Sequence, residues 1–260
     1  MSEIVPPGSM AGAAAGLRAL TPARVALRRA GVSLATCELL DFQRCHALAR
    51  DAVHARLEGA ALAAELSEIT NGGGLRLHSA APDRAAYLQR PDLGRRLDEP
   101  SRRRLDEYSE AHRDRPRPRN LALIVADGLS ALAVERHAAP LIRELLPRLS
   151  QWSLAPVCVV EQGRVAVGDE IGEALGAEIA VVLIGERPGL SSPDSLGAYI
   201  TWEPRPGRTD AERNCISNIR AEGLSAAQAA AQLGDILGEA RRLRLTGVAL
   251  SKRAPALQKG

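Results

Sequence analysis

Short apolar runs recur through the second half of the chain and alternate with amphipathic stretches. One of the longest runs, residues 179–184, leads directly into Gly185 and Glu186. An apolar run this short and rich in Val and Ile is typical of a strand that is buried on both faces of a parallel sheet. Ligands of open α/β sheets bind beside the carboxyl ends of the strands, so Glu186 is the first candidate for a binding residue.

Similar runs predict further strands. They cover residues 121–126, 157–160, 198–201, 215–219 and 248–250. Between them, apolar residues three or four positions apart predict helices, one of them capped by Ser130. This alternation predicts the fold class α/β, with a Rossmann-like, mostly parallel sheet covered by helices and preceded by an N-terminal helical arm.

The first 70 residues are predicted to be helical. Thr21 and Pro22 form a favourable helix start for a segment ending near Gly31, and a longer helix follows Thr36. A run of glycines at 72–74 ends this region. We therefore predict three parts: a disordered terminus at 1–16, a helical arm and subunit-contact region at 17–75, and an α/β domain at 76–260.

The amino-acid composition limits the classes of function that the chain can have. Hydrophobic residues make up 45% of the chain but aromatics only 2%, so the core must consist mainly of Leu, Val, Ile and Ala. Arginine clusters at 102–104 and 113–119 give the chain its basic segments. The 31 acidic residues nearly balance the charge, and no aromatic residue interleaves with the clusters for base stacking. We predict no nucleic-acid partner, with a scaffold or nucleic-acid-binding protein as one rival interpretation.

Cysteine and histidine spacing predicts no metal site. The four cysteines form no C-x-x-C pair, and His46 and His54, eight residues apart on one predicted helix, favour a packing or interface role. No histidine lies near Cys215 in sequence, so a nucleophilic role for it is unsupported. The chain shows no signal peptide and no apolar run near 18 residues, so we expect a cytoplasmic protein without a membrane partner.

Two acidic turns follow apolar strands, one at Asp127 and one at Glu186. They could converge on a single binding site, or they could be ordinary turn sequences, and the spacing leaves both interpretations open. The phosphate-binding motifs G-x-G-x-x-G after a strand and G-x-x-x-x-G-K-[ST] are absent. The residues alone therefore indicate an α/β ligand-binding domain without a self-contained catalytic centre.

Four ordered motifs identify a resemblance. They are R-P-D-L-G-R-R-L at 90–97, V-A-D-G-L-S-A at 125–131, G-E-R-P-G-L at 185–190 and C-I-S-N-I at 215–219. Together they closely resemble the small (light) subunit of ethanolamine ammonia-lyase over residues 18–251. Four motifs in the same order are far more specific than any one of them alone.

The resemblance implies an adenosylcobalamin-dependent ammonia-lyase that converts ethanolamine to acetaldehyde and ammonia by a radical mechanism. It implies a partner, the large TIM-barrel subunit, which holds the substrate in a heterododecamer. The chain would be inactive alone, and its 76–260 domain would cover the cobalamin. A corrinoid- or nucleotide-binding module of another enzyme complex is the main alternative.

The resemblance also implies site residues. The family's small-subunit contacts to the corrinoid fall on Val165, Glu186 and Cys215, with no catalytic or metal-binding residue in this chain. The motif D-x-H-x-x-G is absent, so the cofactor is expected to bind base-on. Some family members carry an amphipathic N-terminus that directs them into a bacterial microcompartment. Residues 1–16 here are rich in Gly and Ala, which leaves both encapsulation and free cytoplasmic assembly open.

Overall fold

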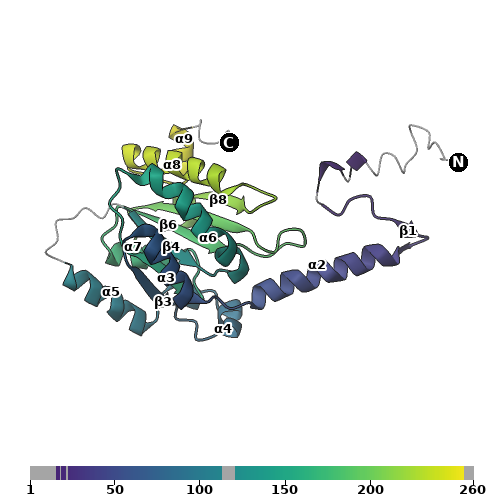
Figure 1. Ribbon diagram of the computed structural model, residues 1–260, viewed down its shortest axis with the longest axis horizontal. Helices are drawn as coiled ribbons and strands as arrows, with labels where there is room; N and C mark the ends of the chain where they lie inside the picture. The colour runs from purple at the N-terminus through teal and green to yellow at the C-terminus, as the bar shows by residue number, and fades with distance from the viewer. Residues whose placement is uncertain (1–15, 18, 22, 113–120, 255–260) are drawn as a thin grey trace.

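The computed structural model describes residues 16–17, 19–21, 23–112 and 121–254 of the chain. A six-stranded sheet in the order β3-β5-β4-β6-β7-β8 forms its centre (Figure 1). The strands are Gly74–His78 (β3), Leu121–Ala126 (β4), Val157–Glu161 (β5), Ile179–Gly185 (β6), Leu196–Trp202 (β7) and Arg213–Ile219 (β8). Neighbours from β3 to β6 are parallel, and only β7 runs against the others. The prediction of a mostly parallel, helix-covered sheet is confirmed.

Helices pack on both faces of this sheet. In chain order the helices and 3-10 turns are Thr36–His54 (α2), Gly59–Thr70 (α3), Arg84–Gln89 (α4), Leu93–Arg95 (η1), Glu99–Ala111 (α5), Ala131–Leu145 (α6), Leu146–Leu149 (η2), Val167–Ala174 (α7), Asp210–Glu212 (η3), Ala226–Leu243 (α8) and Val248–Arg253 (α9). Ser130 Oγ accepts the Ala133 N–H and caps α6, as predicted. No helix in the described part of the chain combines the length and apolar character needed to cross a bilayer.

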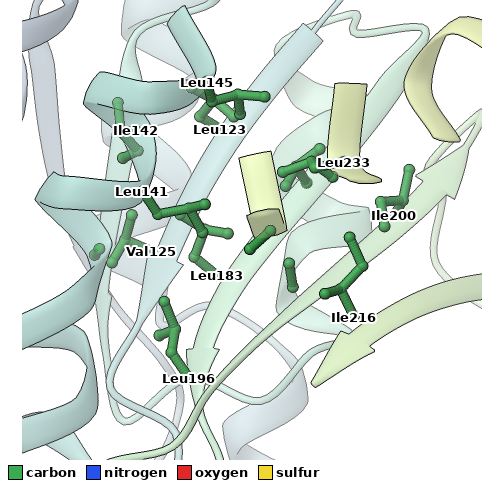
Figure 2. Close-up of a cluster of buried hydrophobic side chains, with 14 of the residues drawn as sticks. Leu123, Val125, Leu141, Ile142, Leu145, Leu183, Leu196, Ile200, Ile216 and Leu233 are labelled. Carbon is green, nitrogen blue, oxygen red and sulfur yellow. The ribbon is translucent and has the colours of Figure 1, made fainter. Parts of the chain in front are cut away.

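The core follows the two-residue period of the strands. Along β4, Leu123 and Val125 face a layer formed by α3, α6 and α8, whereas Ala122 and Ile124 face α5 and α7. Figure 2 shows the first layer, in which leucines and isoleucines from α6 and α8 pack on the sheet. Because both faces are covered, the central strands are apolar at every position, and this is why they form continuous runs in the sequence.

Strand order positions the candidate site. The chain leaves β4 through α6 to reach β5 on one side, and then returns through α7 to β6 on the other side of β4. The connections therefore diverge between β4 and β6. In doubly wound sheets this point, at the carboxyl ends of the strands, forms a crevice in which ligands bind.

Two local expectations were incorrect, and one strand was not predicted. The helix predicted from Thr21 to near Gly31 is replaced by a small antiparallel pair, Arg29–Ala30 (β1) and Ser33–Leu34 (β2). The strand predicted at 248–250 is the first turn of α9, because three consecutive apolar residues do not distinguish a strand from one helical turn. Strand β3 was not predicted, since its sequence is short and follows a glycine run.

Helix α2 projects from the body toward the N-terminal segment (Figure 1). Only Ala49 and Ala52 are buried in it, and large apolar side chains remain exposed, Leu40 among them at 59%. By contrast, α3 packs on the sheet through Leu62 and Leu66. Residues 1–15, most of the segment predicted to be disordered, lie outside the described part of the chain.

Candidate functional site

A tight junction joins β4 to β6 where the crevice opens. The Leu129 N–H donates to the Gly185 carbonyl at 2.9 Å. Gly128 has a φ of +56°, and a Cβ there would lie 2.2 Å from the Gly185 carbonyl oxygen. A Cβ on Gly185 would lie 2.0 Å from the Ser130 carbonyl oxygen. Glycine is therefore required on both strands for the loops to approach this closely.

A cavity of about 430 Å³ lies at this junction. Its walls come from α4, the ends of β4, β5 and β6, and the facing part of β7. The lining residues are Tyr87, Gly128, Leu129, Arg164, Val165, Ile184, Gly185, Glu186, Arg187 and Tyr199. We call this cavity the switch-point pocket. It contains two of the three cofactor-binding residues that the resemblance implied, Val165 and Glu186.

Glu186 is half-buried at the end of β6. Its Oε2 accepts the Ser195 hydroxyl at 2.5 Å and the Asn218 backbone N–H at 3.2 Å. Its Oε1 receives no hydrogen bond from the described residues, and it lies beside Gly197, where a Cβ would come within 3.0 Å of it. One carboxylate oxygen is thus fixed, and the other remains available to accept an N–H from a ligand.

Val165 follows the turn at the end of β5, and the packing around Tyr87 holds it in place. The Tyr87 hydroxyl donates to the Gly163 carbonyl at 3.0 Å, and the Arg164 guanidinium lies 4.3 Å from the centre of the Tyr87 ring. Burial raises the pKa of the Tyr87 hydroxyl. The Arg164 N–H also donates to the Gly94 carbonyl at 2.7 Å. These contacts present Val165 to the pocket as an apolar surface.

Cys215 lies beside the pocket and not in its lining. It is the cross-strand partner of Tyr199, which does line the pocket. Although the residue as a whole is exposed, desolvation raises the pKa of its thiol, the Tyr199 contact opposes the rise and the Glu186 charge adds to it. The thiol therefore stays neutral near pH 7, which suits an apolar contact and disfavours a nucleophile.

A buried ion pair lies beside the switch-point pocket and helps to fix one of its loops. Arg84 Nη1 lies 3.3 Å from Asp127 Oδ2, and both side chains are buried. Asp127 Oδ1 also accepts the Gly163 N–H at 3.0 Å, which fixes the turn that precedes Val165. Asp127 and Glu186 do lie on the same edge of the sheet, as one interpretation of the turns expected. Asp127, however, faces inward and supports the pocket without lining it.

Sequence reasoning missed Tyr87, Arg164 and Tyr199. Arg164 and Tyr199 had a usable signal: Tyr199 belongs to β7, which pairs with β6, and Arg164 follows β5 at the carboxyl edge of the sheet. Tyr87 had none, because α4 is distant in sequence from β5, and only the fold brings the Tyr87 ring against the Arg164 guanidinium.

The structure also places the two histidines and one of the two arginine clusters that the sequence analysis considered. His46 and His54 line one groove between α2 and the loop after β6, with no metal-binding set of His, Cys, Asp or Glu among the described residues. In the arginine cluster at 102–104, Arg102 pairs with Glu170 and Arg103 pairs with Glu99. The cluster at 113–119 lies outside the described residues.

The fold and the pocket define an α/β protein with an open pocket at the carboxyl edge of its sheet and an exposed helix α2. The family model for the ethanolamine ammonia-lyase light chain (EutC) matches residues 11–251. The chain therefore belongs to the ethanolamine ammonia-lyase light-chain family, and the prediction of a lyase subunit is confirmed.

Curated relatives agree over most of their length. The ethanolamine ammonia-lyase small subunit of Azotobacter vinelandii is 60% identical over 240 residues, which cover 92% of this chain and 87% of the relative. The small subunit of Ralstonia nicotianae is 58% identical over 248 residues, 94% of this chain and 90% of the relative. That of Pseudomonas syringae pv. tomato is 57% identical over 240 residues, 92% and 82% of the two chains.

Proposed function

We propose that this light chain forms one wall of an adenosylcobalamin site at its interface with the large TIM-barrel subunit of an ethanolamine ammonia-lyase. The observation that carries the proposal is the position of Val165 and Glu186. They lie in the loops that follow two different strands, β5 and β6, they were implied as corrinoid contacts by sequence resemblance, and they line one pocket at the switch point. Cys215 lies one cross-strand position away from that pocket.

The donor set suits a corrinoid. The periphery of a corrinoid carries amide side chains whose N–H groups would donate to the free Oε1 of Glu186, and its macrocycle would lie on apolar atoms of Val165 and Tyr199. A cavity of about 430 Å³ has the size of a pocket for a drug-sized ligand, and a corrinoid is considerably larger. This chain can therefore cover only part of the cofactor, and the remainder of the site falls to the partner subunit.

When bound, the cofactor supplies the radical chemistry that converts ethanolamine to acetaldehyde and ammonia. Residues of this chain bind and orient the cofactor and exclude water from one side of it, and none is assigned a catalytic role. Base-on binding is part of the proposal, because the family binds the cofactor in this way and the sequence lacks the motif D-x-H-x-x-G that supplies a histidine to cobalt. In the cob(II)alamin state, ¹⁵N-labelling of histidine should leave the EPR hyperfine pattern unchanged, and an altered pattern would contradict base-on binding.

The arm supports assembly with the large subunit. The exposed leucines of α2 form an apolar surface on a helix that projects from the body, and such surfaces usually contact a partner. We therefore propose residues 17–75 as the subunit-contact region and 76–260 as the cobalamin-binding domain of a heterododecamer. We place assembly in the cytoplasm because residues 1–16 lack an amphipathic stripe, and a microcompartment location stays open.

Reconstitution tests the proposal. Ammonia and acetaldehyde release from ethanolamine and adenosylcobalamin should require this chain together with its large subunit, and each chain alone should be inactive. A second test compares Glu186→Gln with Glu178→Gln in the assembled complex, where only the first should weaken cobalamin binding. Cobalamin binding without turnover would favour the alternative, a corrinoid-binding module of another enzyme complex.

A further inference from the structure

A second cavity of about 710 Å³ adjoins the switch-point pocket, and Arg164 and Val165 line both. Its walls come from the η1 region, the start of α7, and the loop between β7 and η3. We call it the arginine cavity, because six arginines (positions 95, 96, 102, 164, 208 and 213) and three acidic residues line it.

The acidic residues are already matched by arginines. Asp169 accepts two hydrogen bonds from Arg213, at 2.7 and 2.6 Å. Glu170 pairs with Arg102. Asp210 lies 3.7 Å from the Nε of Arg213. These contacts neutralise the carboxylates and leave the cavity with an excess of positive charge.

Two of the remaining arginines have no carboxylate partner among the described residues, Arg95 and Arg164. Arg95 is exposed at the mouth of the cavity. Arg164 is half-buried on the wall shared with the switch-point pocket, and its Nη2 donates to the Tyr87 carbonyl at 3.4 Å. An anion in the cavity would supply the counter-charge that both guanidinium groups lack. The arginine cavity is therefore built for an anionic ligand, and guanidinium groups favour phosphate.

The proposed cofactor supplies such a group. The corrin side chains of cobalamin are neutral amides, and its anionic group is the single phosphodiester in the nucleotide loop. A corrinoid placed over Val165 and Glu186 has the arginine cavity as its direct neighbour. We propose that the arginine cavity binds the phosphodiester of the cobalamin nucleotide loop, with Arg95 and Arg164 as its ligands. This inference rests on the proposed function of the switch-point pocket. The same arginines could bind free phosphate, so the test must distinguish free phosphate from the phosphodiester of cobalamin.

The test measures binding to the assembled two-subunit complex and not its activity. Dissociation constants are determined for hydroxocobalamin and for dicyanocobinamide, a corrinoid that lacks the nucleotide loop and its phosphate. Arg95→Gln should weaken hydroxocobalamin binding about tenfold or more, the usual consequence of losing a charge-assisted hydrogen bond. Its affinity for dicyanocobinamide should stay that of the wild type. Arg103→Gln, on the exposed face of α5, is the matched control and should change neither affinity.

The other outcomes contradict the inference in distinguishable ways. Equal weakening of both ligands by Arg95→Gln would mean that the arginine acts on the corrin ring or on the fold. Unchanged binding of both ligands would mean that the cavity holds no part of the cofactor. Inorganic phosphate binding that Arg95→Gln abolishes, with unchanged hydroxocobalamin affinity, would assign the cavity to free phosphate. Failure of the wild-type complex to bind either corrinoid would instead overturn the proposed function.

Discussion

Arg84 and Asp127 form a buried ion pair, with Nη1 and Oδ2 3.3 Å apart at the end of β4. The same guanidinium donates from Nε to the Val53 carbonyl in the last turn of α2, at 2.7 Å. Asp127 in turn accepts the Gly163 N–H beside the switch-point pocket. The pair therefore connects the arm helix to the turn that positions Val165.

Replacing Arg84 should destabilise the chain strongly. Arg84→Met leaves the Asp127 carboxylate buried without its partner and removes the contact to α2. Breaking a buried pair in this way costs about 3 kcal/mol or more. Urea unfolding of the full chain at pH 7.5 measures the loss, and Arg103→Met, at an exposed ion pair, should cost far less. Equal stabilities of the two variants would contradict a structural role for the buried pair.

The same variant should show a characteristic pH dependence. Burial raises the pKa of the Asp127 carboxyl to about 6, and the Arg84 charge opposes the rise. This pKa exceeds the pKa of Asp127 in the unfolded chain, so protonation of Asp127 favours the folded state. The resulting stabilisation is complete below about pH 4 and is lost as the pH rises through about 6. Without the Arg84 charge the pKa of Asp127 rises further, so the loss of stability extends to higher pH. The stability difference between wild type and Arg84→Met should therefore narrow between about pH 7.5 and pH 5, and a constant difference would contradict this account.

The junction of β4 and β6 should tolerate no side chain. In Gly185→Ala the new Cβ would lie 2.0 Å from the Ser130 carbonyl oxygen, which is backbone and cannot rotate away. Overpacking of this kind costs about 1–3 kcal/mol, and a backbone clash should lie at the upper end. The matched control is Gly238→Ala, in the interior of α8 with open space around it, which should stabilise by about 0.5–1 kcal/mol. The two free energies of unfolding should thus change in opposite directions.

The arm should matter for assembly more than for folding. Leu40 is exposed in this chain, so Leu40→Asn should change its free energy of unfolding by less than about 0.5 kcal/mol. If α2 contacts the large subunit, the same change should weaken association, as measured by analytical ultracentrifugation of the two chains. Val248→Asn, equally apolar and exposed but on α9, is the matched control. Association weakened only by Val248→Asn would place the contact surface at the other end of the molecule.

The sequence predicted most of this fold because its central strands are buried on both faces. Continuous apolar runs such as 179–184 then leave little ambiguity, and the glycines after them locate the loops. The errors fall where the local signal is weak. Residues 248–250 are too few to show a period, and β3 lies at the edge of the sheet, where one face is less covered and the apolar pattern is correspondingly weaker.

Part of the candidate site could be predicted from the sequence for a similar reason. Glu186 follows the most recognisable strand, and the rule that ligands bind at the carboxyl edge identified it. The residues that support the pocket could not be predicted, because Arg84 and Tyr87 lie on α4, which is distant in sequence from β4 and β5. Their importance arises from a buried pair and a ring contact that only the folded chain creates.

Hydrogen exchange of the assembled two-subunit complex, with and without hydroxocobalamin, tests the central claim most directly. The account predicts that the cofactor slows amide exchange in residues 163–166 and 186–189, with a smaller effect at 215–218, and leaves 226–243 on α8 unchanged. Slower exchange confined to other segments, with unchanged rates in both loops of the switch-point pocket, would contradict the placement of the cofactor on this chain.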